Sequence, residues 1–191
     1  MPALEPVALN TPHLILRPLT EADVPAIFAI FSHPEVMRYW SYPALTDITQ
    51  AQEMLQRIQA SHREGSAVRL GIERRSDEGL VGTCSLFNFH AASGRAEIGY
   101  ALAREAWGAG VMHEALTALV THAFTTLDLH RLEADIDPRN VASARALERL
   151  GFQREGLLRE RWIVAGEVSD TAFYGLLRSQ WRATRGGGSG G

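Results

Sequence analysis

The sequence lacks lysine entirely, because all 19 of its basic residues are arginine. A P-loop needs a lysine for the β- and γ-phosphates of a nucleotide, and a Schiff-base enzyme needs a lysine amine. Neither class of enzyme fits this chain.

Cysteine is nearly absent, and the single Cys84 lies in an apolar stretch. One cysteine forms no intramolecular disulfide and no cysteine-cage metal site, so a reducing compartment is predicted. His113 and Glu114 begin an H-E-x-x-H motif, but Thr117 occupies the position of the second histidine. We therefore predict no metal site, and Cys84 is interpreted as a core residue rather than a nucleophile.

Long hydrophobic runs are also missing. No apolar run approaches the roughly 20 residues that span a bilayer, and the first ten residues do not combine a basic segment with an apolar core. We expect a cytoplasmic protein without a membrane partner. The formal net charge of -3 argues against a direct nucleic-acid partner.

The remaining composition, with 46% hydrophobic and 21% charged residues in a chain of 191, is typical of one soluble globular domain. We assign that domain to residues 1–185. The last six residues, GGGSGG at 186–191, are typical of a flexible linker.

Hydrophobic periodicity predicts a mixed α/β domain with a mostly antiparallel sheet of about seven strands and helices on both faces. Expected strands cover 13–19, 66–75, 79–90, 95–102, 131–137, 152–164 and 168–177. Expected helices follow the capping box at 20–23, begin near 46, and cover 110–127 and 140–150. Residues 33–44 are predicted to be a loop or short turn.

The most informative stretch runs from Glu97 to Ala115, where a strand leads through Trp107 and two glycines into a helix. The first turn of a helix carries unpaired N–H groups and the positive end of its dipole, so it favours an anion. A phosphate-bearing ligand would be held by the backbone of Gly108, Ala109, Gly110, Val111, Met112 and His113. A simple tight turn is the alternative interpretation.

Two phosphate-binding motifs fail against these residues. The dinucleotide fingerprint G-x-G-x-x-G has His113 at its third glycine, and the P-loop lacks its lysine. The remaining pattern resembles the pyrophosphate-binding motif of the GNAT superfamily of N-acetyltransferases. That motif usually begins with glutamine or arginine, whereas its first position here is Glu105. Many relatives place a lysine or arginine between the glycines, where this chain has Ala109, so phosphate binding is expected to depend on backbone amides.

The resemblance extends over nearly the whole chain and is closest to the ribosomal-protein-alanine N-acetyltransferases. It rests on LILRPLTEAD, HPEVMRYW, AEIGYALAREAWGAGVMHEAL and LHRLEADIDPRNVASARALERLGFQREGLLR, in that order. It implies a GNAT fold, acetyl-CoA as co-substrate and a sheet that splays open at its central strand beside Gly99. It also implies that pantetheine pairs with the backbone of Tyr100, Ala101 and Leu102.

Asn140 and Ser143 lie three residues apart at the start of a predicted helix, so both can face the same ligand. The resemblance implies that Asn140 hydrogen-bonds the pantetheine arm and that Ser143 protonates or hydrogen-bonds the sulfur. Alternatively, Asn140 is only an N-cap and Ser143 a solvated residue.

Glu97 is our candidate for the base that accepts the ammonium proton. Strand alternation places it on the same face as Gly99, two residues away. A surface carboxylate that pairs with Arg95 is the alternative.

Within residues 33–44, the loop from His33 to Tyr42 contains Arg38, Tyr39, Trp40 and Tyr42. In family terms this loop covers the acceptor site, and its aromatic side chains would shape an amine channel. Core packing beneath the loop explains them equally well.

Together these patterns predict an N-acetyltransferase in which an amine attacks acetyl-CoA directly in a ternary complex. The leading acceptor is a protein N-terminal α-amine, for example on a ribosomal protein. A small-molecule amine such as a polyamine or antibiotic is close behind, and a low-turnover acyl-CoA sensor is the competing class. A monomer or a homodimer is expected.

Overall fold

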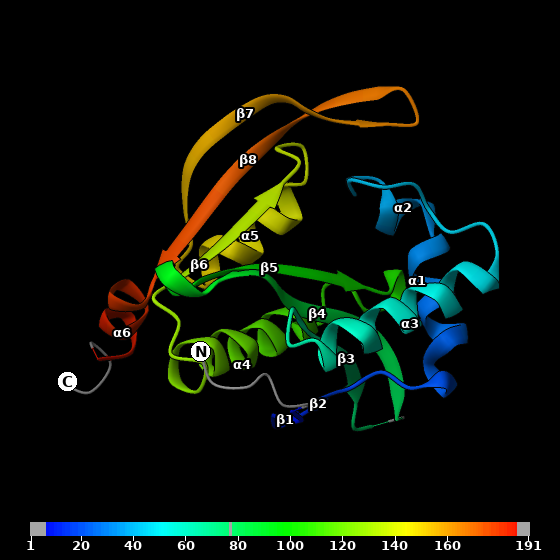
Figure 1. Cartoon of the computed structure of the whole chain (residues 1–191), viewed down its shortest axis with the longest axis horizontal. Helices are drawn as coiled ribbons and strands as arrows, with labels where there is room; N and C mark the ends of the chain where they lie inside the picture. Colours follow the sequence, from blue (N-terminus) through cyan, green and yellow to red (C-terminus); the bar gives the residue numbers. More distant parts are fainter. Residues whose placement is uncertain (1–6, 77, 187–191) are drawn as a thin grey trace.

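The computed structural model describes residues 7–76 and 78–186. These residues form one sheet of eight strands in the order β1-β2-β3-β4-β5-β6-β8-β7, in which only β5 and β6 run parallel (Figure 1). The strands are β1 Leu9–Asn10, β2 Leu14–Arg17, β3 Val68–Arg74, β4 Gly79–His90, β5 Arg95–Leu102, β6 Arg131–Ile136, β7 Gln153–Val164 and β8 Glu167–Leu177. The helices are α1 Val24–Ser32, α2 Pro34–Met37, α3 Ile48–Arg63, α4 Val111–Thr125, α5 Val141–Arg149 and α6 Arg178–Gly186.

The predicted fold class is confirmed, and the differences concern short elements. β1 has two residues and α2 has four, so neither spans enough chain to produce a periodic pattern. Helix α6 was not predicted, and Gly186, assigned to the linker, is its last residue. The rest of that predicted linker lies outside the described residues.

The two faces of the sheet are covered by different helices. On one face, Ile98 and Leu102 of β5 belong to a core with Leu116 and Leu119 of α4. On the other, Ala101 joins a separate core made with α1 and α3. Because alternate side chains of a strand point to opposite faces, β5 contributes to both cores.

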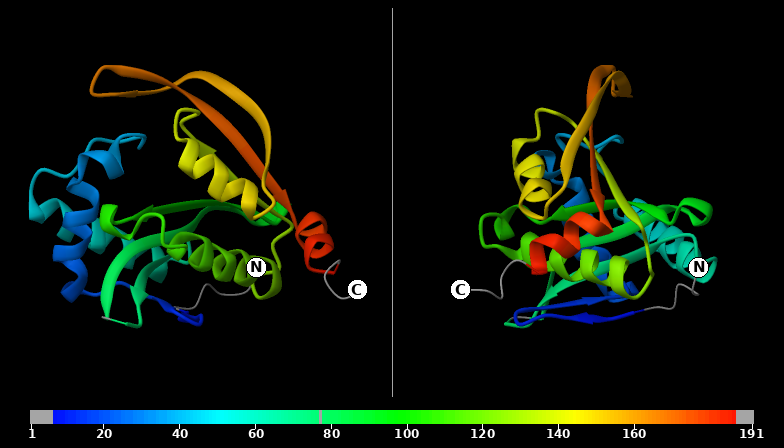
Figure 2. Two further views of the ribbon diagram at one scale, coloured as in Figure 1. Left: turned by 180° about the vertical axis from the view of Figure 1, so that it is seen from behind. Right: turned by 90° about the vertical axis from the view of Figure 1, so that its left-hand side faces the viewer.

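The sheet opens between its two parallel strands. β5 pairs with β6 only from Arg95 to Glu97, whereas its pairing with β4 continues to Leu102. Beyond the opening, the hairpin of β7 and β8 rises from the sheet and arches over α5 (Figures 1 and 2). The second half of β5 therefore has a free edge inside the molecule.

Within residues 7–76 and 78–186, no helix combines the length and apolarity needed to cross a membrane. The same part of the chain contains no cluster of three His, Cys, Asp or Glu side chains that could hold a metal ion.

Candidate active site

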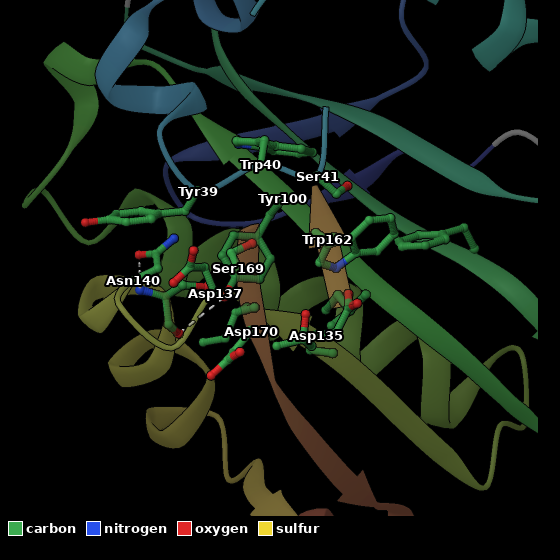
Figure 3. A pocket seen from close by; sticks show the side chains of 17 residues that line it. Tyr39, Trp40, Ser41, Tyr100, Asp135, Asp137, Asn140, Trp162, Ser169 and Asp170 are labelled. Carbon is green, nitrogen blue, oxygen red and sulfur yellow. Dashed lines mark hydrogen bonds between the residues drawn. The ribbon is translucent and has the colours of Figure 1, made fainter. Parts of the chain in front are cut away.

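The opening between β5 and β6 holds a cavity of about 170 Å³, which we call the splay cavity (Figure 3). Six segments line it: the loop after α2, β4 at Phe87, the middle of β5, the end of β6 with the loop that follows, the start of α5, and the β7–β8 hairpin. Asn140 and Ser143 lie in this lining, and their contacts with a bound cofactor stay a prediction. The splay of the sheet thus brings together segments that are far apart in sequence.

Asn140 and Ser143 form the first turn of α5. Asn140 Oδ1 accepts a hydrogen bond from the Ser143 N–H at 3.1 Å, so Asn140 is the N-cap of the helix. Ser143 is buried rather than solvated, and its Oγ lies 2.7 Å from the hydroxyl of Tyr100. The alternative interpretation of a solvated Ser143 is therefore wrong.

The phenol of Tyr100 is a site residue that the sequence analysis missed, because only its backbone was assigned. Burial raises the pKa of Tyr100 to about 12, although the hydrogen bond with Ser143 opposes this shift. The hydroxyl therefore keeps its proton at neutral pH and can donate it toward Ser143. No local pattern in the sequence shows that β5 and α5 meet at these two residues.

Three aspartates line the splay cavity and were also missed: Asp135, Asp137 and Asp170. Hydrogen bonds from Arg139 hold the pKa of Asp137 below its usual value, although burial acts in the opposite direction. Asp170 Oδ1 accepts a hydrogen bond from the Glu160 N–H at 2.8 Å. Asp137 is paired with Arg139 and Asp135 with Arg161, so Asp170 is the aspartate of this lining that no described residue holds in an ion pair.

Glu97 lies at the last β5–β6 pair, opposite Glu133, and is not among the residues that line the splay cavity. Its suggested partner Arg95 instead donates to Glu133 Oε2 at 2.7 Å. The role of Glu97 as a base stays a prediction.

The loop after α2 contributes part of the predicted acceptor site. Tyr39 and Trp40 line the splay cavity, and Trp40 also packs edge-on against Phe31 with ring centroids 5.5 Å apart. Arg38 forms an ion pair at 3.2 Å with Glu167 at the hairpin tip. Tyr39 and Trp40 therefore both pack against neighbouring groups and shape the cavity.

The backbone of the predicted phosphate loop adopts conformations that require glycine at two positions. Gly108 and Gly110 have φ angles of 78° and 77°, in the left-handed region that favours glycine. A Cβ at either position would meet nothing within 4 Å, so the loop is open on that side. Among the described residues, no side chain caps the N-terminus of α4. The binding of a diphosphate there stays a prediction.

The segment before this loop is occupied by protein contacts. Trp107 Nε1 donates to the carbonyl of Leu102 at 2.9 Å. Arg104 lies 4.7 Å from the centroid of the Trp107 ring and donates to Glu35 at 3.0 Å.

A second cavity of about 700 Å³ lies between the sheet and helices α1 and α3, and we call it the helix-side cavity. It meets the splay cavity at Trp40, Ser41, Phe87, Gly99 and Tyr100, which line both. Cys84 is among the residues that line it, but its buried side chain belongs to the core with α4 on the other face of the sheet, where burial raises the pKa of the thiol to about 12. The thiol is therefore protonated and belongs to the core, as predicted.

Comparisons with known proteins agree with this geometry. Residues 13–153 match the acetyltransferase (GNAT) domain. The chain is 37% identical over 173 residues to the uncharacterised N-acetyltransferase p20 of Bacillus licheniformis, covering 91% of this chain and 97% of that protein. It is 30% identical over 139 residues to the [ribosomal protein uS5]-alanine N-acetyltransferase of Escherichia coli (strain K12), covering 70% of each. The structure of Mycobacterium smegmatis RimJ in complex with CoA-disulfide superposes with a TM-score of 0.83 at 25% identity, over 97% of this chain and 98% of that one.

Proposed function

Because the chain belongs to the GNAT family of acetyl-CoA-dependent acetyltransferases, we propose that it transfers acetyl to a primary amine held in the splay cavity. The single observation that carries this proposal is the opening of the sheet after Glu97 beside the buried Tyr100–Ser143 hydrogen bond. There a thioester and an amine can meet in a site enclosed by protein.

We propose that the uncapped amides at the start of α4 bind the diphosphate of acetyl-CoA. The helix dipole and the open glycine backbone support this assignment. The contact would use the backbone from Gly108 to His113, without a lysine or arginine between the glycines.

The free edge of β5 would pair with the pantetheine arm like an added strand. Ala103 N–H donates to Val81 of β4, so by alternation the backbone groups of Ile98, Tyr100 and Leu102 point to the open side. This alternation favours Tyr100 and the N–H of Leu102 over Ala101 as the partners of pantetheine, since the Leu102 carbonyl already accepts a hydrogen bond from Trp107. Asn140 would approach the same arm from α5.

In the proposed reaction, the neutral amine attacks the thioester carbonyl, a C–N bond forms and the C–S bond breaks. Ser143 would donate a proton to the departing sulfur and recover one from Tyr100, whose raised pKa keeps it protonated. The proton lost by the amine would pass to a carboxylate, directly or through water. Glu97 and Asp170 are the two candidates that we compare below.

Two classes of primary amine are candidates for the acceptor. The similarity to an alanine N-acetyltransferase of a ribosomal protein favours a protein N-terminal α-amine. A small-molecule amine is favoured by the ion pairs of Glu167 at the hairpin tip with both Arg38 and Arg139, because they hold the hairpin against the loops after α2 and before α5.

The test is a thiol-release screen with acetyl-CoA and a panel of amines. The panel contains peptides with Ala, Ser, Met and Thr N-termini, polyamines, aminoglycosides and free amino acids. We expect free CoA to appear with at least one class and to require Ser143. If acetyl-CoA binds in calorimetry but no amine releases thiol, the protein is an acyl-CoA sensor and the proposal fails.

A further inference from the structure

The helix-side cavity differs in chemistry from the splay cavity that it joins. Its walls come mainly from apolar side chains of α1, α3 and the loop at 40–45, including Phe31, Leu45 and Met54. Two arginines, Arg57 and Arg69, also line it. Among the described residues that form this lining, none is an aspartate or a glutamate.

Arg69 is the informative residue. Its guanidinium lies 5.5 Å from the centroid of the Phe87 ring, and no described residue gives that guanidinium a hydrogen bond or an ion pair. Burial lowers the pKa of Arg69. The nearby Tyr42 does not neutralise it, because burial raises the pKa of this phenol to about 12. A partly buried cation without a counter-charge is suited to bind an anion.

The register of the sheet connects this cation to the opening. Arg69 of β3 pairs with Ser85 of β4, and Ser85 pairs with Gly99 of β5. Residues paired in this way project their side chains on the same face. The Cα atoms of Arg69 and Gly99 are therefore separated by two strand spacings, roughly 10 Å.

Gly99 lies where the two cavities meet, because it belongs to both linings. A Cβ at this position would lie 3.0 Å from Phe87 Cε1 and 3.3 Å from Ser85 Oγ, so the junction is narrow and has no room for a side chain. A small molecule that reaches past Gly99 beside the Phe87 ring would have Asp170 of the splay cavity at one end and Arg69 at the other.

We propose that the helix-side cavity is the specificity pocket for the acceptor, and that the acceptor is a small amphoteric amine. Its apolar body would occupy the cavity, its carboxylate would bind Arg69, and its amine would pass Gly99 toward Ser143. An amino acid with an apolar side chain has this chemistry. The inference rests on the proposed acetyl transfer and names its substrate class.

The charges argue against the other acceptors. A polyamine would place its second cationic group beside Arg57 and Arg69. A protein N-terminus would have to lead its following chain out from under α1 and α3, whereas a small molecule needs no such exit. A cavity of about 700 Å³ is within the range that holds a small ligand.

The test compares acids with their amides. Acetyl transfer is measured as thiol release with L-methionine, L-phenylalanine and their carboxamides, beside spermidine and a Met-initiated peptide. The amides have the more weakly basic amines and are intrinsically favoured near pH 7.5, so the informative quantity is the acid-to-amide ratio of kcat/KM in each protein. We expect Arg69→Gln to lower this ratio roughly tenfold to a hundredfold, as for the loss of a hydrogen-bonded charge.

Arg63→Gln is the matched control, because Arg63 is an exposed arginine at the end of α3 outside both cavities. It should leave the ratio unchanged, and thermal melting of each variant verifies folding. Arg69→Lys should restore part of the preference and keeps the test informative if Arg69→Gln folds poorly.

An unchanged ratio in Arg69→Gln, or fastest transfer to spermidine or the peptide regardless of Arg69, would overturn the inference and leave the proposed acetyl transfer intact. If none of the amines tested gives thiol release, the proposed function is wrong, and the inference falls with it.

Discussion

The two cavities on either side of Gly99 have opposite chemistry. The splay cavity is lined by aspartates and by the hydroxyls of Tyr100 and Ser143, whereas the helix-side cavity is apolar and carries arginines. In the proposed function, the acidic side would handle the protons of the reaction and the apolar side would select the acceptor. This division suggests that acetyl transfer and acceptor choice can be altered independently, and substitutions on each side test it.

The largest effect is expected from Ser143→Ala. Loss of the proton donor for the departing sulfur should lower kcat about a hundredfold, while the affinity for acetyl-CoA in calorimetry stays within a few fold. Tyr100→Phe is the companion variant and should cost less, because Ser143 can still recover a proton from water. A nearly normal kcat in Ser143→Ala would contradict the proposal that Ser143 of the splay cavity donates the proton to the departing sulfur.

Gly110→Ala should weaken acetyl-CoA binding about tenfold. An alanine at a φ of 77° costs about 1–2 kcal/mol, so the amides of the loop would lose their orientation. Gly156→Ala in β7 is the control, since a Cβ there meets nothing within 4 Å and no positive φ is required. Calorimetry with acetyl-CoA measures both. Equal affinities in the two variants would argue against diphosphate binding at α4.

Asp170→Asn and Glu97→Gln decide which carboxylate serves the amine. Asp170 lines the splay cavity and Glu97 does not, so Asp170→Asn should raise the KM for the amine three- to tenfold. Glu97→Gln should change it less than twofold. Initial rates against amine concentration at saturating acetyl-CoA give the answer, and the reverse order would restore Glu97 as the base.

The smallest effect concerns Cys84, whose side chain belongs to the core with α4. Because burial raises the pKa of this thiol to about 12, the thiolate form is disfavoured in the folded protein. Alkylation by iodoacetamide, followed by mass spectrometry, should stay slow and rise little between pH 7 and 9.5, where an exposed thiol ionises. Unfolded protein should label rapidly. Fast labelling of the native protein would show that the core around Cys84 opens to reagents.

Prediction from sequence succeeded for features of the fold that depend on nearby residues. Asn140 and Ser143 lie at the start of a helix as expected, and Gly108 and Gly110 form a turn before another, whereas their contacts with a ligand stay predictions. The order of the long strands and helices likewise follows from local periodicity and turn residues.

Features that depend on long-range pairing were missed. The hydrogen bond between Tyr100 and Ser143 joins residues 43 positions apart, and Arg69 is related to Gly99 only through the register of three strands. Glu97 was nominated from strand alternation alone, which gives the face of a residue but not its distance from the opening. Such relations need the sheet itself.

The ion pairs at the tip of the β7–β8 hairpin should make its position depend on the salt concentration. Glu167 is held by Arg38 from the end of α2 and by Arg139 from the loop before α5, and all three side chains are well exposed. Dissolved ions weaken attraction between exposed charges. A high salt concentration should therefore loosen the hairpin tip from these two loops, while the buried part of the splay cavity stays unchanged. Ionic strength would then govern how readily molecules enter and leave that cavity.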